Sequence, residues 1–356
     1  MHMAIPLKLP PRYEYEGPTR QGGQGTIYVC RDKYLDRQVA IKVMKGVSDP
    51  SAIRKELAAI QAVRSRHVAQ VYDLIVAGST FGLVQEFVPG PTVKEHARTA
   101  QGTNDFLKVL YQIARGLSDI HESKKIHRDI KPSNMRFDQE EVVKILDFGL
   151  AADALPDIET VDARGTPSFI APELYRTPPV RYTCAVDTFA FGVTARVIAE
   201  GGALLPAFRQ TPPYGSPLPS FASCPIKLAG DIVSILDQTL DEDPKKRPTM
   251  GDVRDVLGRR LLFGRHRAVV TYGAVHELCE PGKAIQLKVG NDGIAIKYDG
   301  LQFTVDAVVG DVYINNARPT AGSALPDCCV ITLGLPSLGS SRTFVPFNVS
   351  HPEVVL

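Results

Sequence analysis

The stretch HRDIKPSN, His127–Asn134, places a carboxylate, an amide and basic side chains within eight residues of chain. Three other segments accompany it: the glycine-rich QGGQGTIY at 21–28, the apolar run VAIK at 39–42, and the triplet DFG at 147–149. Glycines let a hairpin turn tightly and let backbone N–H groups approach phosphate oxygens. A lysine in an apolar run is costly without a partner. Carboxylate and amide oxygens are hard ligands that suit Mg²⁺ or Mn²⁺, and the chain shows no zinc pattern.

Phosphoryl transfer needs these parts together: a phosphate cradle, a cation, metal ligands, and a group that orients the attacking hydroxyl. In this order along the chain they resemble the eukaryotic-type (Hanks-type) serine/threonine protein kinases, over roughly residues 12–263. The resemblance implies an α+β, bilobal fold. An antiparallel β-rich N-lobe with one helix is expected over about 12–87, and a mainly helical C-lobe over about 91–263. It also implies ATP as the phosphoryl donor and proteins with serine or threonine hydroxyls as substrates.

The resemblance assigns roles within the central stretch. Asp129 is expected to orient the substrate hydroxyl, and Asn134 to hold a metal ion together with Asp147. Lys131, two residues after the aspartate, is similar to the lysine of the serine/threonine branch that neutralises charge near the γ-phosphate. Arg128 resembles the arginine that contacts a phosphorylated activation segment.

The nucleotide site is expected to come from the first lobe. The resemblance pairs Lys42 with the ATP phosphates and with Glu56 of the following helical segment. The remaining expected ATP contacts are Gly22, Gly23, Gly25, Ile27, Ala40, and the hinge residues Glu86 and Val88. Two positions depart from the family pattern. Arg20 replaces the first glycine of the loop, and Arg136 stands where an aliphatic side chain forms the floor under the base, so we expect the methylene stem of Arg136 to cover the adenine.

The segment GTPSFIAPE, 165–173, is similar to the end of an activation segment. A phosphate there would add almost two negative charges and recruit arginines, so autophosphorylation is expected, with Thr160 favoured over Thr166 and Ser168. The hydroxyl of Thr166 is alternatively structural, because the matching residue contacts the catalytic aspartate and lysine. Structural roles are implied for three further residues: Glu173 paired with Arg247, and Asp187 on the catalytic loop.

Apolar periodicity predicts the regular elements of these lobes. Strands are expected in the runs 25–30, 38–44, 68–78 and 81–88, and helices over 51–65, 104–123, 185–202, 231–240 and 250–262. Asn104 or Asp105 is a cap signal for the second helix, and Gly201-Gly202 ends the third. The third is apolar nearly all round, which predicts that it is buried.

From about residue 267 to 356 the pattern becomes β-like, with apolar runs separated by Gly, Asp, Asn and Pro, which predicts a separate all-β domain. Its runs at 310–316 and 329–334 are similar to the later strands of forkhead-associated domains. The Gly-Arg and Ser-x-x-His elements that hold phosphothreonine in those domains do not occur within residues 267–356. We therefore favour a degenerate sandwich used for stability or for contact with a protein partner over a phosphopeptide-binding domain.

The composition bounds the remaining possibilities. The formal net charge is +2 over 356 residues, which argues against nucleic acid as the main partner. No apolar run approaches the roughly 20 residues that span a bilayer, and the scattered cysteines suit reduced thiols in a cytoplasmic protein.

Two alternatives to a protein kinase stay open. The first is a scaffold with the kinase fold but no turnover, which Arg20 and Arg136 alone support. The second is a small-molecule kinase, although such kinases usually lack a lysine matching Lys131 and the Ala-Pro-Glu segment.

Overall fold

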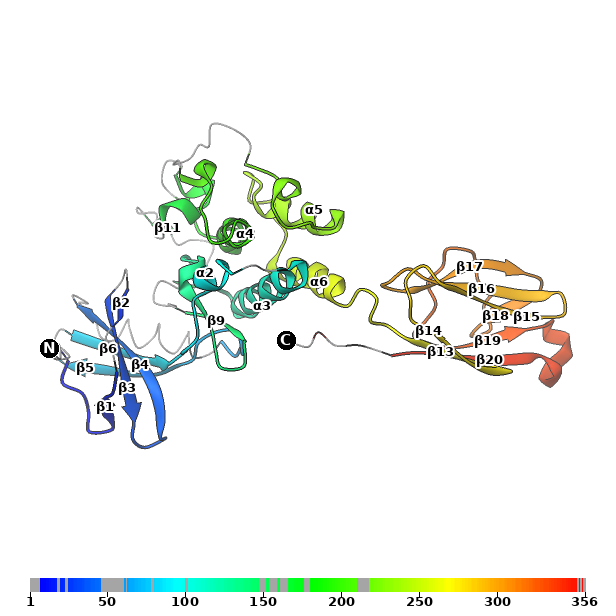
Figure 1. Ribbon diagram of the computed structural model, residues 1–356, viewed down its shortest axis with the longest axis horizontal. Helices are drawn as coiled ribbons and strands as arrows, with labels where there is room; N and C mark the ends of the chain where they lie inside the picture. The colour runs from blue at the N-terminus through cyan, green and yellow to red at the C-terminus, as the bar shows by residue number, and fades with distance from the viewer. Residues whose placement is uncertain are drawn as a thin grey trace. The chain divides into compact units, whose positions relative to one another are not determined.

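The computed structural model describes residues 7–17, 20–22, 25–45, 61, 63–77, 80–99, 102–146, 152–153, 159–160, 166–175, 180–209, 218–350, 352 and 354. The chain divides into two compact units, Met1–Leu257 with Leu356, and Gly258–Val355. In Figure 1 the first unit runs from blue to yellow-green and the second from yellow to red. The predicted α+β architecture, a β-rich part and a helical part followed by an all-β domain, is confirmed. Among the helices of the described residues, none has the length and apolarity that a bilayer crossing requires.

The N-terminal sheet has strand order β1-β3-β4-β6-β5, with β2 paired to β3. Its strands are β1 (Tyr13–Tyr15), β2 (Arg20–Gly22), β3 (Gly25–Asp32), β4 (Arg37–Lys45), β5 (Val71–Ala77) and β6 (Thr80–Glu86). Along β4, Val39, Ile41 and Val43 alternate into an apolar core. Ala40 and Lys42 therefore lie on the opposite face of the sheet. The helix expected over 51–65 lies outside the described residues except at 61 and 63–65.

The helical lobe contains α2 (Val93–His96), α3 (Thr103–Glu122), α4 (Cys184–Ala199), α5 (Gly230–Thr239) and the start of α6 (Met250–Leu261). Figure 1 shows α3 and α4 at the centre of this lobe, away from the blue strands. Helix α4 is buried on nearly every side and is followed by Gly201 and Gly202 with positive φ, as predicted. The predicted cap of α3 is wrong. Gly102 is the N-cap and, as a glycine, has no side chain to accept a hydrogen bond. Asp105 lies within the first turn of α3 and pairs with His96.

Short elements complete the lobe and carry most of the candidate site. They are β7 (Lys125–Ile126), η1 (Pro132–Asn134), β8 (Met135–Phe137), β9 (Val143–Ile145), β10 (Ala152–Asp153), β11 (Glu159–Thr160), η3 (Pro167–Phe169), η4 (Pro172–Tyr175), β12 (Val180–Arg181), η5 (Pro206–Arg209) and η6 (Phe221–Ser223). Strands β8 and β9 form a two-stranded ribbon, and β10 pairs with β7. The stretch His127–Asn134, which we call the catalytic loop, lies between β7 and β8.

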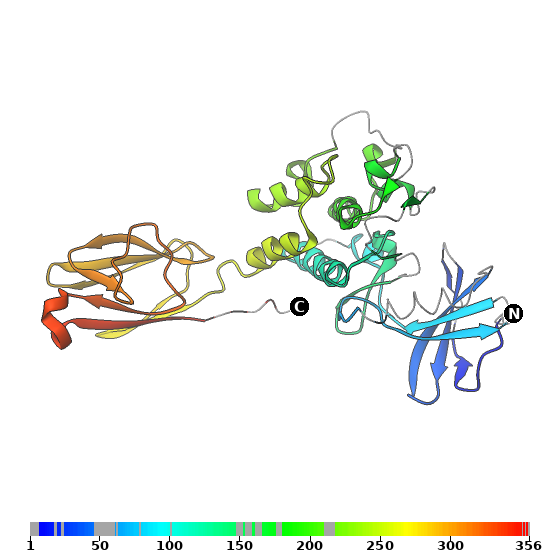
Figure 2. The ribbon, with the colours of Figure 1, turned by 180° about the vertical axis from the view of Figure 1, so that it is seen from behind.

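The second unit is a β sandwich. One sheet has the order β14-β13-β20-β19-β18 and the other β15-β16-β17, and Figure 2 shows the two layers as yellow-to-red and orange strands. Its strands are β13 (Ala268–Tyr272), β14 (Ala274–Leu278), β15 (Ala284–Val289), β16 (Asp292–Tyr298), β17 (Phe303–Val309), β18 (Val312–Ile314), β19 (Cys328–Leu333) and β20 (Thr343–Val349), with η7 (Pro336–Ser341) before β20. Strands β17 and β18 are separated by Gly310, which turns the chain at φ 73°.

Candidate active site

The backbone of the catalytic loop is held by Asp187, which lies in the first turn of α4. One carboxylate oxygen of Asp187 accepts from the backbone N–H of His127 at 2.8 Å, and the other accepts from that of Arg128 at 2.9 Å. Arg128 has φ 70°, a conformation that costs a residue with a Cβ about 1–3 kcal/mol. His121 of α3 contacts Asp187 at 2.9 Å. Burial alone would raise the pKa of Asp187, but these hydrogen bonds and the neighbouring histidines lower it below its ordinary value.

The hydrogen bonds to Asp187 hold the loop so that Asp129 lies beside three polar side chains. Oδ2 of Asp129 accepts from Nζ of Lys131 at 2.7 Å and from Nδ2 of Asn134 at 2.8 Å, and Oδ1 accepts from the hydroxyl of Thr166 at 2.9 Å. Lys131 also donates to the Thr166 hydroxyl at 2.6 Å. Asp129 is 3% exposed. Burial would raise the pKa of Asp129, but Lys131, Asn134 and Thr166 together lower it, so the carboxylate is ionised at neutral pH.

The residue before Asp147 is tied to the same cluster. The backbone N–H of Leu146 donates to the carbonyl of Asn134 at 2.8 Å, and the Leu146 carbonyl accepts from Nε2 of His127 at 2.9 Å. A carbonyl cannot donate, so Nε2 of His127 carries the proton. His127 is fully buried and thus has a structural position. Asp147 itself lies outside the described residues, as do Glu56 and Gly23.

The N-terminal sheet places the expected nucleotide contacts on one face. Ile27 of β3 is the cross-strand partner of Lys42, and Ala40 lies two residues before Lys42 on β4. Lys42 is only 3% exposed although it is a cation. Gly22 pairs with Gly25 across the β2–β3 hairpin, and Arg20 pairs with Ile27 at the start of β2. The sheet therefore brings Ile27, Ala40 and Lys42 together on the face opposite its apolar core.

The hinge after β6 is fixed by two cations that the sequence patterns did not assign there. The Glu86 carboxylate forms an ion pair with Lys144 of β9 at 2.8 Å and accepts the backbone N–H of Gln70 at 3.1 Å. Arg136 of β8 donates from Nε to the Val88 carbonyl at 3.1 Å, and its NH2 group donates to the Gly90 carbonyl. We expected the stem of Arg136 to cover the base, and the structure adds that its guanidinium binds the hinge backbone.

The activation-segment candidates lie in different settings. Thr160 is in β11 opposite Val180 of β12, and Ser168 is in η3. Thr166 is the candidate whose hydroxyl contacts the Asp129 cluster. At the end of the segment, Arg247 donates two hydrogen bonds of 2.8 Å to the Glu173 carboxylate, and the Arg247 side chain is fully buried.

His121, Lys144 and the guanidinium contacts of Arg136 are the contributions that sequence reasoning missed. Lys144 had a usable signal, because it stands alone in the apolar run VKIL, as Lys42 does in VAIK. His121 had none, because it lies 66 residues from Asp187 and only the packing of α3 on α4 brings the two together.

Comparison with known proteins agrees with this geometry. The model of the family described as "Protein kinase domain" matches residues 13–257. The protein named "Serine/threonine-protein kinases PknA" of Corynebacterium glutamicum is 37% identical to this chain over 194 residues, which is 51% of this chain and 41% of that protein. A probable serine/threonine-protein kinase of Clostridium acetobutylicum is 29% identical over 200 residues, 53% of this chain and 30% of that protein. The chain thus spans less than half the length of these curated relatives.

Proposed function

The chain belongs to the protein kinase family, and we propose that it transfers the γ-phosphoryl group of ATP to serine and threonine hydroxyls of proteins. The observation that carries the proposal is the Asp129 cluster. A buried, ionised carboxylate that contacts Lys131 at 2.7 Å and Asn134 at 2.8 Å combines a group for orienting a hydroxyl with a neighbouring cation and a metal-ligand side chain. The relatives named as serine/threonine-protein kinases support the acceptor class.

In this proposal Asp129 accepts a hydrogen bond from the substrate hydroxyl and aligns it, while Lys131 offsets negative charge on the transferred group. Lys42 binds the ATP phosphates and pairs with Glu56. The backbone of the glycine-rich segment 21–25 covers the phosphates. Asn134 and Asp147 supply oxygen ligands for Mg²⁺, with Mn²⁺ as the alternative. The donor set fits, because oxygen ligands suit these hard cations and Lys42 is a buried cation on the nucleotide face. A bound metal ion neutralises developing charge on the phosphates.

We propose autophosphorylation at Thr160 rather than Thr166. A phosphate on Thr166 would place about two negative charges against Asp129, which its hydroxyl contacts at 2.9 Å. The hydroxyl of Thr166 instead suits a structural role that holds Lys131 beside Asp129.

For the C-terminal unit, Gly258–Val355, we propose that its surface contacts a protein partner. Titration of a phosphothreonine peptide into the full chain tests directly whether this unit binds phosphopeptides instead.

The test is transfer of radiolabelled phosphate from γ-labelled ATP to a generic protein substrate, followed by acid hydrolysis and phosphoamino-acid analysis. We expect phosphoserine and phosphothreonine with Mg²⁺, and no transfer after chelation with EDTA. Phosphotyrosine as the main product, or transfer to small-molecule alcohols but not to protein, would contradict the proposal. Mass spectrometry of the same sample reports the modified residues of the activation segment.

A further inference from the structure

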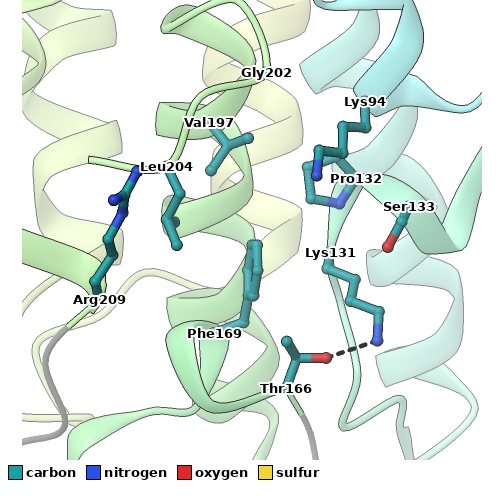
Figure 3. A pocket seen from close by; sticks show the side chains of 10 residues that line it. All are labelled: Lys94, Lys131, Pro132, Ser133, Thr166, Phe169, Val197, Gly202, Leu204 and Arg209. Atoms are coloured by element: carbon teal, nitrogen blue, oxygen red, sulfur yellow. Dashed lines mark hydrogen bonds between the residues drawn. The ribbon is translucent and has the colours of Figure 1, made fainter. Parts of the chain in front are cut away.

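A pocket of about 480 Å³ opens beside Lys131 in the helical lobe. Figure 3 shows it from close by, with Lys94, Pro132 and Lys131 along one wall and Leu204 and Arg209 along the other. The described residues that line it are Lys94, Lys131, Pro132, Ser133, Thr166, Phe169, Val197, Gly202, Leu204 and Arg209. Lys131 and Thr166 belong to the Asp129 cluster, so the pocket begins where we place the acceptor hydroxyl.

The fold builds this pocket from five separate elements. Lys94 comes from α2, Pro132 and Ser133 from η1, Phe169 from η3, Val197 from α4 and Arg209 from η5. Gly202 brings the walls together. It has φ 86°, and a Cβ there would lie 3.0 Å from the Lys94 carbonyl, so the chain after α4 packs directly on α2. This approach places Leu204 and Arg209 opposite Lys94.

The pocket combines an apolar interior with positive charge. Phe169, Val197 and Leu204 provide the apolar surface. Lys94 and Arg209 are exposed, and within the described part of the chain neither side chain forms a hydrogen bond or an ion pair. None of the described lining residues carries a carboxylate. Two available cations beside an apolar surface favour a ligand with both an acidic and an apolar side chain.

We propose that this pocket selects protein substrates in which an aspartate or glutamate, next to an apolar side chain, lies within about three residues of the phosphorylated hydroxyl. Three residues of extended chain cover roughly 10 Å, which suits a pocket that begins at Lys131. Arg209 and Lys94 bind the acidic side chain, and Phe169, Val197 and Leu204 contact the apolar one. The inference rests on the proposed kinase activity and names its substrate class.

Steady-state kinetics with matched peptides tests the inference. Each peptide carries one acceptor serine with an acidic and a leucine residue at neighbouring positions, scanned over three places on either side, and its partner replaces the acid by the neutral amide. We expect wild-type enzyme to show a KM about three- to fivefold lower for the best acidic peptide than for its amide partner, the size that an exposed ion pair supports. The preference should shrink as salt is raised.

The variants Arg209→Gln and Lys94→Gln should remove that preference by raising KM for the acidic peptide to that of its amide partner. Arg209→Glu should reverse it in favour of a lysine-containing peptide. Lys33→Gln, an exposed change in the turn between β3 and β4, is the matched control and should keep the preference. Efficient but charge-indifferent transfer, or a preference that survives both pocket variants, would overturn this inference alone. Absence of transfer to every peptide and protein would instead overturn the proposed function.

Discussion

The kinase unit and the C-terminal sandwich differ in what they bury. The kinase unit buries ionisable groups, among them Lys42, Asp129, Asp187 and Arg247. In the described residues of 258–355 the buried set is apolar apart from Thr332 and the hydroxyl of Tyr298. That hydroxyl donates to the Gly300 carbonyl at 2.9 Å, so it is satisfied. Both units bury apolar side chains, and among the described residues the buried charged groups lie in the kinase unit.

The buried charged groups indicate which unit carries the chemistry. Taking a charged group out of water costs several kcal/mol unless partners satisfy it, so a fold selected only for stability has little reason to contain one. In the kinase unit the buried carboxylates of Asp129 and Asp187 each have two or more partners, and these partners fix their positions. The sandwich has the packing expected of a stable contact module.

The largest effect on stability is expected from Asp187→Ala. It leaves the backbone N–H groups of His127 and Arg128, and the side chain of His121, without their acceptor, and it releases the unusual φ of Arg128. We expect the free energy of unfolding of the kinase unit to fall by about 3–5 kcal/mol and kcat to fall on the order of 10²-fold, because Asp129 loses its position. Urea unfolding and steady-state kinetics measure both. If the alanine variant does not fold, the milder Asp187→Asn replaces it. An unchanged kcat in Asp187→Asn would contradict the role of Asp187 in positioning Asp129.

A comparable loss of stability without loss of catalysis is expected from Phe347→Ala. Phe347 is fully buried in the sandwich and packs edge-on against Phe303 at 5.6 Å between ring centroids. Removing the ring should destabilise this unit by about 3–5 kcal/mol. Phosphate transfer to a peptide should keep its kcat at temperatures where the kinase unit stays folded. A parallel fall in kcat would show that the two units are not separable in function.

A smaller effect concerns pH. Asp129 and Asp187 have pKa values below those of the unfolded chain. The unfolded state then binds more protons, so their contribution to stability is complete above the ordinary carboxyl pKa of about 4 and is lost as pH falls through the lower folded pKa. Urea midpoints between pH 5 and pH 3 should fall more for wild type than for Asp187→Asn. Equal falls would show that Asp187 contributes nothing to acid sensitivity.

The smallest effect is expected from Arg136→Leu. The change removes hydrogen bonds to the Val88 and Gly90 carbonyls and loosens the hinge. One such bond contributes about 1 kcal/mol, so KM for ATP should rise about threefold to fivefold with kcat little changed. Arg318→Leu, which removes an exposed arginine that contacts Asp311 in the sandwich, is the matched control and should leave KM for ATP unchanged. A lower KM for ATP in Arg136→Leu would show that an aliphatic floor outweighs the hinge bonds.

Much of the fold could be predicted because its signals are local. Apolar periodicity was enough for α3, α4, α5 and α6, and alternation for most strands. The errors have physical causes. Asp105 was a plausible cap, but the contact with His96 occupies its carboxylate. Strand β14, with the sequence AVHEL, was missed because its charged and polar residues weaken the alternation.

The site was predictable where one segment carries several functional residues, as in His127–Asn134. It was not predictable where packing joins distant residues. The contact of His121 with Asp187, the ion pair of Lys144 with Glu86, and the pocket between Lys94 and Arg209 all depend on tertiary structure. The predicted residues Glu56, Gly23 and Asp147 lie outside the described residues, and their roles stay predictions.

The most direct measurement of the central claim is kcat for phosphate transfer by Asp129→Asn, with ATP affinity measured on the same sample. The substitution keeps the shape of the side chain and removes the charge that orients the hydroxyl. We predict a loss of about 10²- to 10⁴-fold in kcat with ATP affinity retained. The matched control, Asp306→Asn on an exposed position of β17, should keep full activity. An Asp129→Asn enzyme with wild-type kcat would contradict the account.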